Sequence, residues 1–143
     1  MRKLTVFLLL VLLLPATFSC REPVPLAPLE PVVTLLTPND GATLTGGNVG
    51  VRIFLENFTM VSQSGMPNKA NEGHVVYYLD TGPLVVNGAV VESPGGMSET
   101  SYETSYTWTN VAPGPHTFSV QLVNNDGSPF LPPIAVRANV TVR

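Results

Sequence analysis

Hydrophobic and polar residues alternate along several short stretches of the chain, and turn residues separate these stretches. The clearest case is 116–122, where one face carries His116, Phe118, Val120 and Leu122 and the other carries Thr117, Ser119 and Gln121. A period of two between turns indicates a half-buried β-strand. Residues 49–56, 102–108 and 134–142 alternate in the same way, and 32–37 form a short apolar stretch. Residues 74–80 are apolar on both faces, which predicts a central position in a sheet.

These stretches predict the fold class. Asn87-Gly88 between apolar residues adds a hairpin over 84–91. The count reaches about seven or eight short strands in roughly 110 residues, which predicts an all-β, antiparallel immunoglobulin- or fibronectin-like β-sandwich. In that topology, 74–80 and 116–122 are antiparallel neighbours. The aromatic residues are expected mainly in its core: Tyr77, Tyr78, Tyr102, Tyr106 and Trp108.

The N-terminus has the order of a secretory signal peptide. Two basic residues precede the apolar run 4–14, and Pro15 ends that run. Cys20, the only cysteine, follows Ser19, and the segment resembles a bacterial lipoprotein signal in which Cys20 is lipidated. Ordinary cleavage near Cys20 and secretion is the alternative. We therefore expect a signal peptide over 1–19, a lipid-anchored Pro-rich spacer over 20–31 and the sandwich over 32–143.

Charge and motif content argue against two functional classes. After loss of residues 1–19 the chain keeps five basic and ten acidic residues, a formal balance of −5. An acidic domain without basic clusters is a poor candidate for nucleic-acid binding. No nucleophile elbow surrounds a serine, and no Gly-rich phosphate loop is present. We expect neither an enzyme nor a nucleic-acid-binding protein.

The two histidines are expected at opposite ends of the sandwich. His74 begins one strand and His116 begins its antiparallel neighbour, so about 20 Å separates them. They should not share a metal ion. His116 follows a Pro-Gly-Pro turn, and we expect it to be a hydrogen-bonded structural residue. His74 lies at the end where the long 57–73 loop enters, which makes His74, Asp126 and Met66 the candidate ligands for copper or zinc. A blue-copper site is not expected, because it needs a thiolate and Cys20 precedes the fold.

Three segments carry a resemblance to a known family. Residues 73–80 (GHVVYYLD), 113–117 (PGPHT) and 124–127 (NNDG) resemble, in the same order, the patterns G-H-x-H-x-x-x-D, P-G-x-H-T and N-D-H of a family of small extracytoplasmic immunoglobulin-like domains. The resemblance implies this fold behind a lipoprotein signal, in a family whose function is largely uncharacterised. Val76 and Gly127 stand where those patterns have further histidines, so this chain keeps only His74 of a histidine-rich end.

The function predicted from these features is binding or scaffolding outside the cytoplasm. We expect a lipid-anchored domain that contacts an envelope or surface protein through its loops, since loops on a rigid sandwich are where such domains recognise partners. The expected contact residues, with the apolar ones exposed, are Phe58, Met60, Met66, Asn125, Phe130 and Leu131. A copper- or zinc-binding domain and a purely structural envelope module are the two alternatives.

Overall fold

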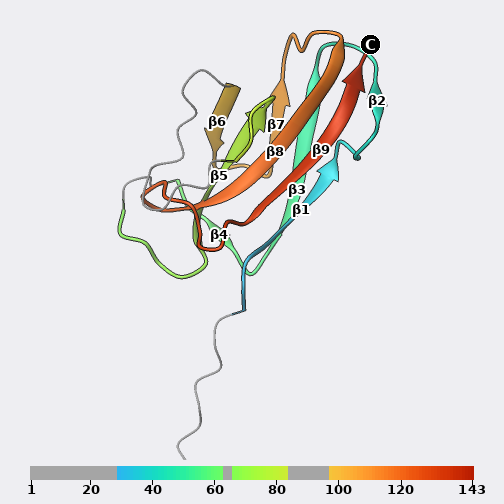
Figure 1. Cartoon of the computed structure of the whole chain (residues 1–143). Coiled ribbons are helices and arrows are strands. Elements are labelled where there is room, and N and C mark those ends of the chain that lie inside the picture. The colour runs from blue at the N-terminus through green and yellow to red at the C-terminus, as the bar shows by residue number, and fades with distance from the viewer. Residues whose placement is uncertain (1–28, 63–65, 84–96) are drawn as a thin grey trace, which may run out of the picture.

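The structure is a computed structural model that describes residues 29–62, 66–83 and 97–143. Nine β-strands lie in these residues: β1 (Val32–Thr37), β2 (Thr43–Leu44), β3 (Val49–Glu56), β4 (Thr59–Met60), β5 (Glu72–Leu79), β6 (Met97–Ser101), β7 (Ser105–Trp108), β8 (Gly114–Asn124) and β9 (Ala135–Val142). They form two sheets, drawn in Figure 1. The described residues contain no helix long and apolar enough to cross a membrane.

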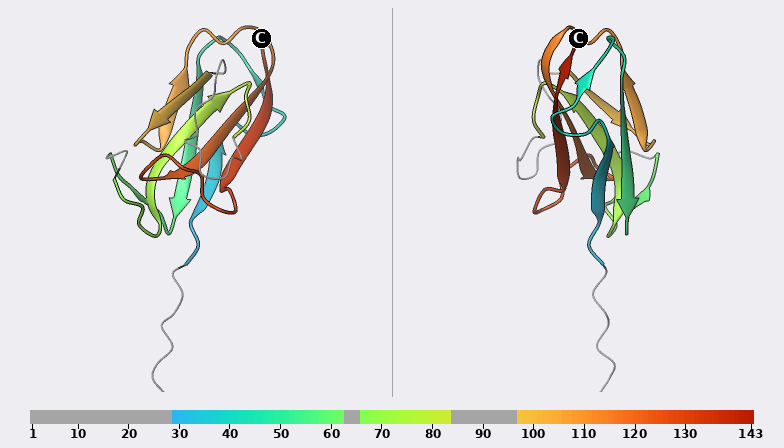
Figure 2. Two further views of the ribbon diagram at one scale, coloured as in Figure 1. Left: turned by 60° about the vertical axis from the view of Figure 1, so that its left-hand side comes forward. Right: turned by 90° about the vertical axis from the view of Figure 1, so that its right-hand side faces the viewer.

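The two sheets pack face to face as a β-sandwich. One sheet has the order β1-β3-β7, and the other has the order β2-β9-β8-β5-β4, with β6 also paired to β5. The second view in Figure 2 shows the two layers, with β1 and β3 in one and β8 and β9 in the other. All strand pairs are antiparallel except the short β2–β9 and β4–β5 pairs. The prediction of an all-β immunoglobulin-like sandwich is confirmed.

The core lies where the alternating pattern placed it. The inward residues of β8 are fully buried: Phe118, Val120 and Leu122. They share the core with Val51, from β3 in the opposite sheet, and with Tyr77, from the neighbouring strand β5. Tyr77 stacks on Tyr106, and Tyr106 meets Trp108 edge to face. Tyr77, Tyr78 and Trp108 are buried as predicted, and Tyr106 is half-buried against the core.

The outward face of β8 is also buried, which the sequence pattern did not predict. Ser119 and Gln121 are almost completely buried although they alternate with the apolar residues. They pair across the sheet with Tyr78 and Val76, and the Tyr78 hydroxyl donates to Gln121 Oε1 over 3.1 Å. The strand is therefore a central one rather than a half-buried one. For β5, the prediction that both faces are buried is confirmed.

Of the predicted strand over 102–108, only residues 105–108 form a strand, β7, and the preceding β6 was not predicted. The chain forms β6 beside β5, leaves that sheet at Tyr102–Thr104, and then forms β7 beside β3 in the opposite sheet. Residues 102–104 continue the alternating pattern although they lie between the two strands, so periodicity alone does not show where β7 begins. Tyr102 is 37% exposed, so the expectation that it lies in the core is wrong. The predicted hairpin over 84–91 lies outside the described residues.

Candidate functional site: the two ends of the sandwich

One end of the sandwich, which we call the loop end, receives the chain from the N-terminal segment. Two asparagines with left-handed backbone, Asn57 and Asn71, hold this entry point. Asn71 Nδ2 donates to the Leu29 carbonyl over 2.6 Å, and Asn57 Nδ2 donates to the Glu30 carbonyl over 3.2 Å. Figure 1 shows the entry below β1 and the C-terminus at the opposite end. As predicted, the first strand begins at the same end as the 57–73 loop.

The loop end has two shallow pockets that meet at Lys69. A pocket of about 510 Å³ is lined mainly by the loop before β9, with Phe130 and Leu131, and by Asn71 and Glu30. A second pocket of about 540 Å³ is lined by Met60, Met66, Glu72 and Asn125, among others. Lys69 borders both pockets and lies 3.4 Å from Glu72 Oε1. The two depressions therefore lie on either side of Lys69, and the first includes Glu30 and Pro31 of the chain entry in its lining.

The predicted contact residues all lie at the loop end, but they differ in exposure. Met66 is 47% exposed and Leu131 is 65% exposed, as predicted for apolar anchors. Phe58, Met60 and Phe130 instead pack against the core, and the rings of Phe58 and Phe130 meet edge to face at 6.0 Å. The prediction that these three are exposed is wrong. The pairing of β4 with β5 draws Phe58 and Met60 onto the sandwich, and Phe130 packs against Phe58 and the core.

Asn125 is buried and has a structural position. Its Nδ2 donates to the Pro67 carbonyl over 3.1 Å and to Glu72 Oε1 over 3.0 Å. It therefore ties the turn after β8 to the loop before β5. The Asn125 side chain is fully buried although the residue lines the second pocket, so it is not available as an exposed contact residue.

The three candidate metal ligands lie at the loop end in different environments. His74 is 3% exposed and contacts Tyr102 edge to face at 5.6 Å; burial lowers its pKa, although the Asp126 charge opposes this. Its Nδ1 has no hydrogen-bond partner among the described residues. The Asp126 carboxylate is occupied by donors from Ser128 and Asn68, which hold its pKa below the usual range. The described residues contain no group of three His, Cys, Asp or Glu that could hold a metal ion.

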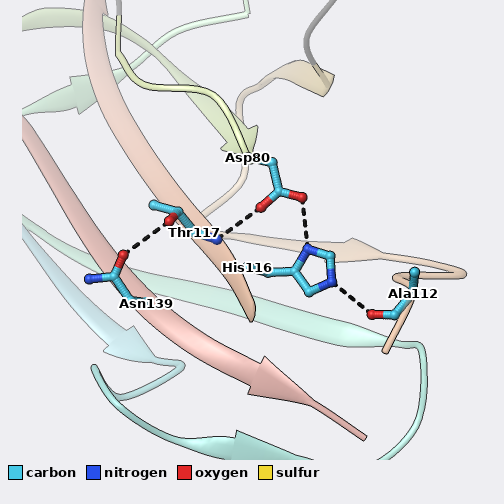
Figure 3. Close-up of polar contacts among 5 residues, drawn as sticks. All are labelled: Asp80, Ala112, His116, Thr117 and Asn139. Carbon is cyan, nitrogen blue, oxygen red and sulfur yellow. Dashed lines mark hydrogen bonds and ion pairs between the residues drawn. The ribbon is translucent and has the colours of Figure 1, made fainter. Parts of the chain in front are cut away.

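The opposite end, which we call the network end, carries a chain of polar contacts that joins four segments; Figure 3 shows the part around Asp80, His116, Thr117 and Asn139. Asp80, directly after β5, accepts from His116 Nδ1 over 2.7 Å and from the Thr117 amide over 2.9 Å. The Thr117 hydroxyl donates to Asn139 Oδ1 over 3.0 Å. The backbone N–H of Asn139 donates in turn to Asp40 Oδ1 over 2.8 Å. The network therefore fastens the ends of β5, β8 and β9 to the turn between β1 and β2.

Both ring nitrogens of His116 face acceptors. Nδ1 lies 2.7 Å from the Asp80 carboxylate, and Nε2 lies 2.7 Å from the Ala112 carbonyl. Both contacts are hydrogen bonds only if both nitrogens carry protons, which is the imidazolium form. The hydrogen bond with Asp80 raises the pKa of His116, partial burial opposes this, and the Ala112 carbonyl and the Asp80 charge raise it further. The prediction of a hydrogen-bonded structural His116 is confirmed.

The register also confirms that the two histidines lie at opposite ends. His74 pairs with Val123 near the end of β8, whereas Leu79 pairs with Phe118 near its start. Sequence reasoning did not find Asp80, Asn139 or Asp40 as partners of His116 and Thr117. One signal for the contact between Asp80 and His116 was available. Asp80 and the segment 113–117 both belong to the family patterns given above, and the strands that carry them pair with each other.

Comparisons with known proteins show similarity of fold only. No protein-family profile matches the chain, and no curated protein is significantly similar in sequence. The fibronectin type III-like modules of Clostridium thermocellum CbhA are 15% identical, with a TM-score of 0.46, over 80% of this chain and 47% of theirs. The PKD domain of human KIAA0319 is 15% identical, with a TM-score of 0.43, over 87% of this chain and 91% of that domain.

An engineered protein is also similar, at 17% identity and a TM-score of 0.47, over 82% of this chain and 21% of its own. The chain thus spans less than half the length of this protein and of the CbhA modules. The identification as an immunoglobulin-like sandwich follows from the strand order and register described above.

Proposed function

We propose that this protein is an exported binding or scaffolding domain, anchored by lipid at Cys20, that contacts an envelope or surface protein through its loop end. It is not an enzyme in this proposal. The observation that carries the proposal is the gathering of exposed apolar side chains, Leu29, Met66 and Leu131, at the end where the chain enters. Exposed apolar groups beside a pocket are a common feature of protein contact sites.

The geometry of the entry supports this choice of end. Asn57 and Asn71 fix the last residues before β1, so the direction in which the chain leaves the domain is set by the loop end itself. A spacer of eleven residues in polyproline II would reach roughly 34 Å. The contact surface would then face the anchored side, toward a membrane protein or a neighbour close to the bilayer.

The network end supports the same choice by contrast. His116, Thr117 and Asn139 have their side-chain hydrogen bonds to one another or to nearby protein groups. Such groups gain little from a partner, because their hydrogen-bonding capacity is already used. Exposed apolar side chains gain from burial in proportion to the area covered.

The test is photo-crosslinking from single positions in the source organism. A crosslinking residue at Leu131 or Met66 should yield one defined protein adduct, and the same residue at the exposed Thr45, near the other end, should yield none. The Met66→Asp/Leu131→Asp double variant should lose complex formation while keeping its fold. Equal adducts from all three positions, or none from any, would favour the purely structural module.

The anchor is tested separately. Metabolic labelling with a clickable fatty acid should mark the wild-type protein and not Cys20→Ser. Loss of membrane association in that variant is the expected result. An unlabelled, fully soluble wild-type protein would instead support secretion without an anchor.

A further inference from the structure

The outer face of the β1-β3-β7 sheet carries an exposed aromatic residue, Phe54, on the part of β3 that pairs with β1 and extends past the residues paired with β7. Phe54 lies on β3, the middle strand, and is 53% exposed. Its neighbour across the sheet on β1 is Thr34, and the exposed Val32 and Leu36 lie on the same strand. Phe54 is outside the loop end and outside the network end, so neither site described above uses it.

The charges beside Phe54 are arranged symmetrically around it. Arg52 and Glu56 are exposed and lie two residues before and two residues after Phe54, which places them on the same face of β3. At about 3.3 Å per residue, each lies roughly 7 Å from Phe54 along the strand. The described residues give neither side chain an ion pair with this domain.

From this arrangement we infer that the outer face of β1, β3 and β7 pairs with the same face of a second copy of this chain. Consider a two-fold axis that lies between the two faces at the level of Phe54 and runs perpendicular to the strands. It brings the two Phe54 rings together. It also places Arg52 of each copy opposite Glu56 of the other, giving two ion pairs for one aromatic contact. A residue pattern that matches itself under a two-fold rotation is what a closed dimer interface requires.

The charges also decide the orientation of the pair. If the two β3 strands ran parallel, Arg52 would face Arg52 and Glu56 would face Glu56, and both contacts would be repulsive. The antiparallel arrangement turns both contacts into attractions. The two sheets would pack about 10 Å apart, as in other aligned sandwiches. The chain entries at Leu29 then lie at opposite ends of the pair.

The size of the face sets the expected affinity. Around Phe54 the two strands β1 and β3, spaced by about 4.8 Å, cover roughly 200 Å² of projected area over six residues. Stable interfaces bury about 800 Å² on each partner. The pairing should therefore be weak, with a Kd of roughly 0.1–1 mM. The inference does not rest on the proposed lipid anchor.

The experiment uses the chain from residue 20 onward with Cys20→Ser, which contains all core residues, Val33 to Val142. Sedimentation equilibrium gives the Kd, and concentration-dependent amide shifts in NMR spectra locate the contact. The wild type should self-associate, with shifts confined to β1, β3 and β7. Arg52→Glu and Glu56→Arg should each weaken self-association at least tenfold, because each places like charges opposite one another.

Charge exchange makes the test specific. A mixture of the Arg52→Glu and Glu56→Arg proteins should associate with each other at least as tightly as the wild type, since every contact is again attractive. The Arg52→Glu/Glu56→Arg double variant should also recover self-association. Arg137→Glu, which makes the same change of net charge on the exposed part of β9, should have no effect.

Two results would overturn the inference. One is a wild-type Kd above about 5 mM, with no concentration-dependent shifts on β3. The other is self-association that both single variants retain, which would place the contact elsewhere. Circular dichroism confirms that each variant is folded. The mixture keeps the test valid if one variant is merely less stable, because association in the mixture requires opposite charges at both contacts.

Discussion

The two ends of the sandwich differ in what their side chains contact. At the network end, Asp80, His116, Thr117 and Asn139 bind one another and join segments that are distant in sequence. At the loop end, polar side chains hold the backbone, whereas apolar side chains such as Leu131 remain exposed. The contrast indicates that the network end maintains the fold and that the loop end is available for contact. The predictions below test this division.

The largest expected effect comes from a glycine at the loop end. A Cβ built on Gly73 would lie 1.9 Å from the Val123 carbonyl oxygen, a backbone atom that has no freedom to move away. Gly73→Ala should therefore lower the free energy of unfolding by about 3 kcal/mol or more, because β5 and β8 must separate. Chemical denaturation with fluorescence detection measures this loss.

Gly50 provides the matched control. It also lies in a strand, and its nearest contact to an added Cβ, Thr107 Oγ1, is 3.9 Å away. Gly50→Ala should change the stability by less than about 1 kcal/mol. Similar losses in both variants would show that close backbone approach is not what requires glycine at residue 73.

Removal of the central carboxylate should weaken the network end. Asp80→Ala leaves His116 Nδ1 and the Thr117 amide without their acceptor, which should lower the free energy of unfolding by about 2 kcal/mol. The exposed Glu99 is the control, and Glu99→Ala should be nearly neutral. Thermal unfolding of the two variants beside the wild type checks this prediction. Equal stability of Asp80→Ala and wild type would mean that the network does not fasten the fold.

The His116 contribution should depend on pH. Its pKa is raised in the folded protein, so its stabilising effect is complete below the unfolded value of 6.5 and is lost as the pH rises through the folded pKa. The loss should be on the order of 1 kcal/mol, because Asp80 is partly exposed and solvent screens the pair. Denaturation between pH 5.5 and 9 should show this decrease in the wild type but not in His116→Gln.

The apolar side chains of the loop end should contribute little to stability. Met66→Ser and Leu131→Ser remove exposed groups, so each should change the free energy of unfolding by less than about 0.5 kcal/mol. Phe130→Ser, at a residue packed on the core, should cost distinctly more. Denaturation curves of the three variants separate contact residues from core residues. A large loss for Leu131→Ser would end its assignment as a free contact residue.

Metal binding at the loop end is expected to be absent. Calorimetric titration of the wild type with copper or zinc should show no one-to-one binding at His74, because Asp126 already accepts three hydrogen bonds. The His74→Ala variant should therefore give the same titration as the wild type. The His74 imidazole is also buried together with its Nδ1 atom, which makes it a poor position for a metal ligand. Tight binding that is lost in His74→Ala would establish the copper or zinc alternative instead.

The sequence predicted the strands that have a strong local pattern. β1, β3, β8 and β9 lie close to the positions expected, and β5 is buried on both faces as its continuous apolar run indicated. The two-residue strands β2 and β4 were missed, because two residues are too few to display a period. β6 was missed as well, and Tyr102 was placed in a strand although it lies between β6 and β7, because the alternating pattern continues through that connection.

The candidate sites were predicted less completely. His74, Asp126 and Met66 lie at one end, as chain direction and strand order predicted, and the role of that end stays a prediction. The exposure of Phe58, Met60 and Phe130 was not, because whether a loop folds back on the core depends on pairings such as β4 with β5. The partners of His116 also escaped prediction, since one hydrogen bond in that network joins residues 99 positions apart.

The sequence by itself determined the positions of the longer strands β1, β3, β5, β8 and β9, the inward faces of β3, β8 and β9, and the opposite placement of the two histidines. These properties follow from the two-residue period of a strand and from antiparallel pairing, which neighbouring residues encode. Only the tertiary structure decided that the outward face of β8 is buried, that Gly73 lies against a carbonyl and that Asp80 binds His116. Each of these depends on contacts between segments far apart in the chain, and local periodicity contains no information about them.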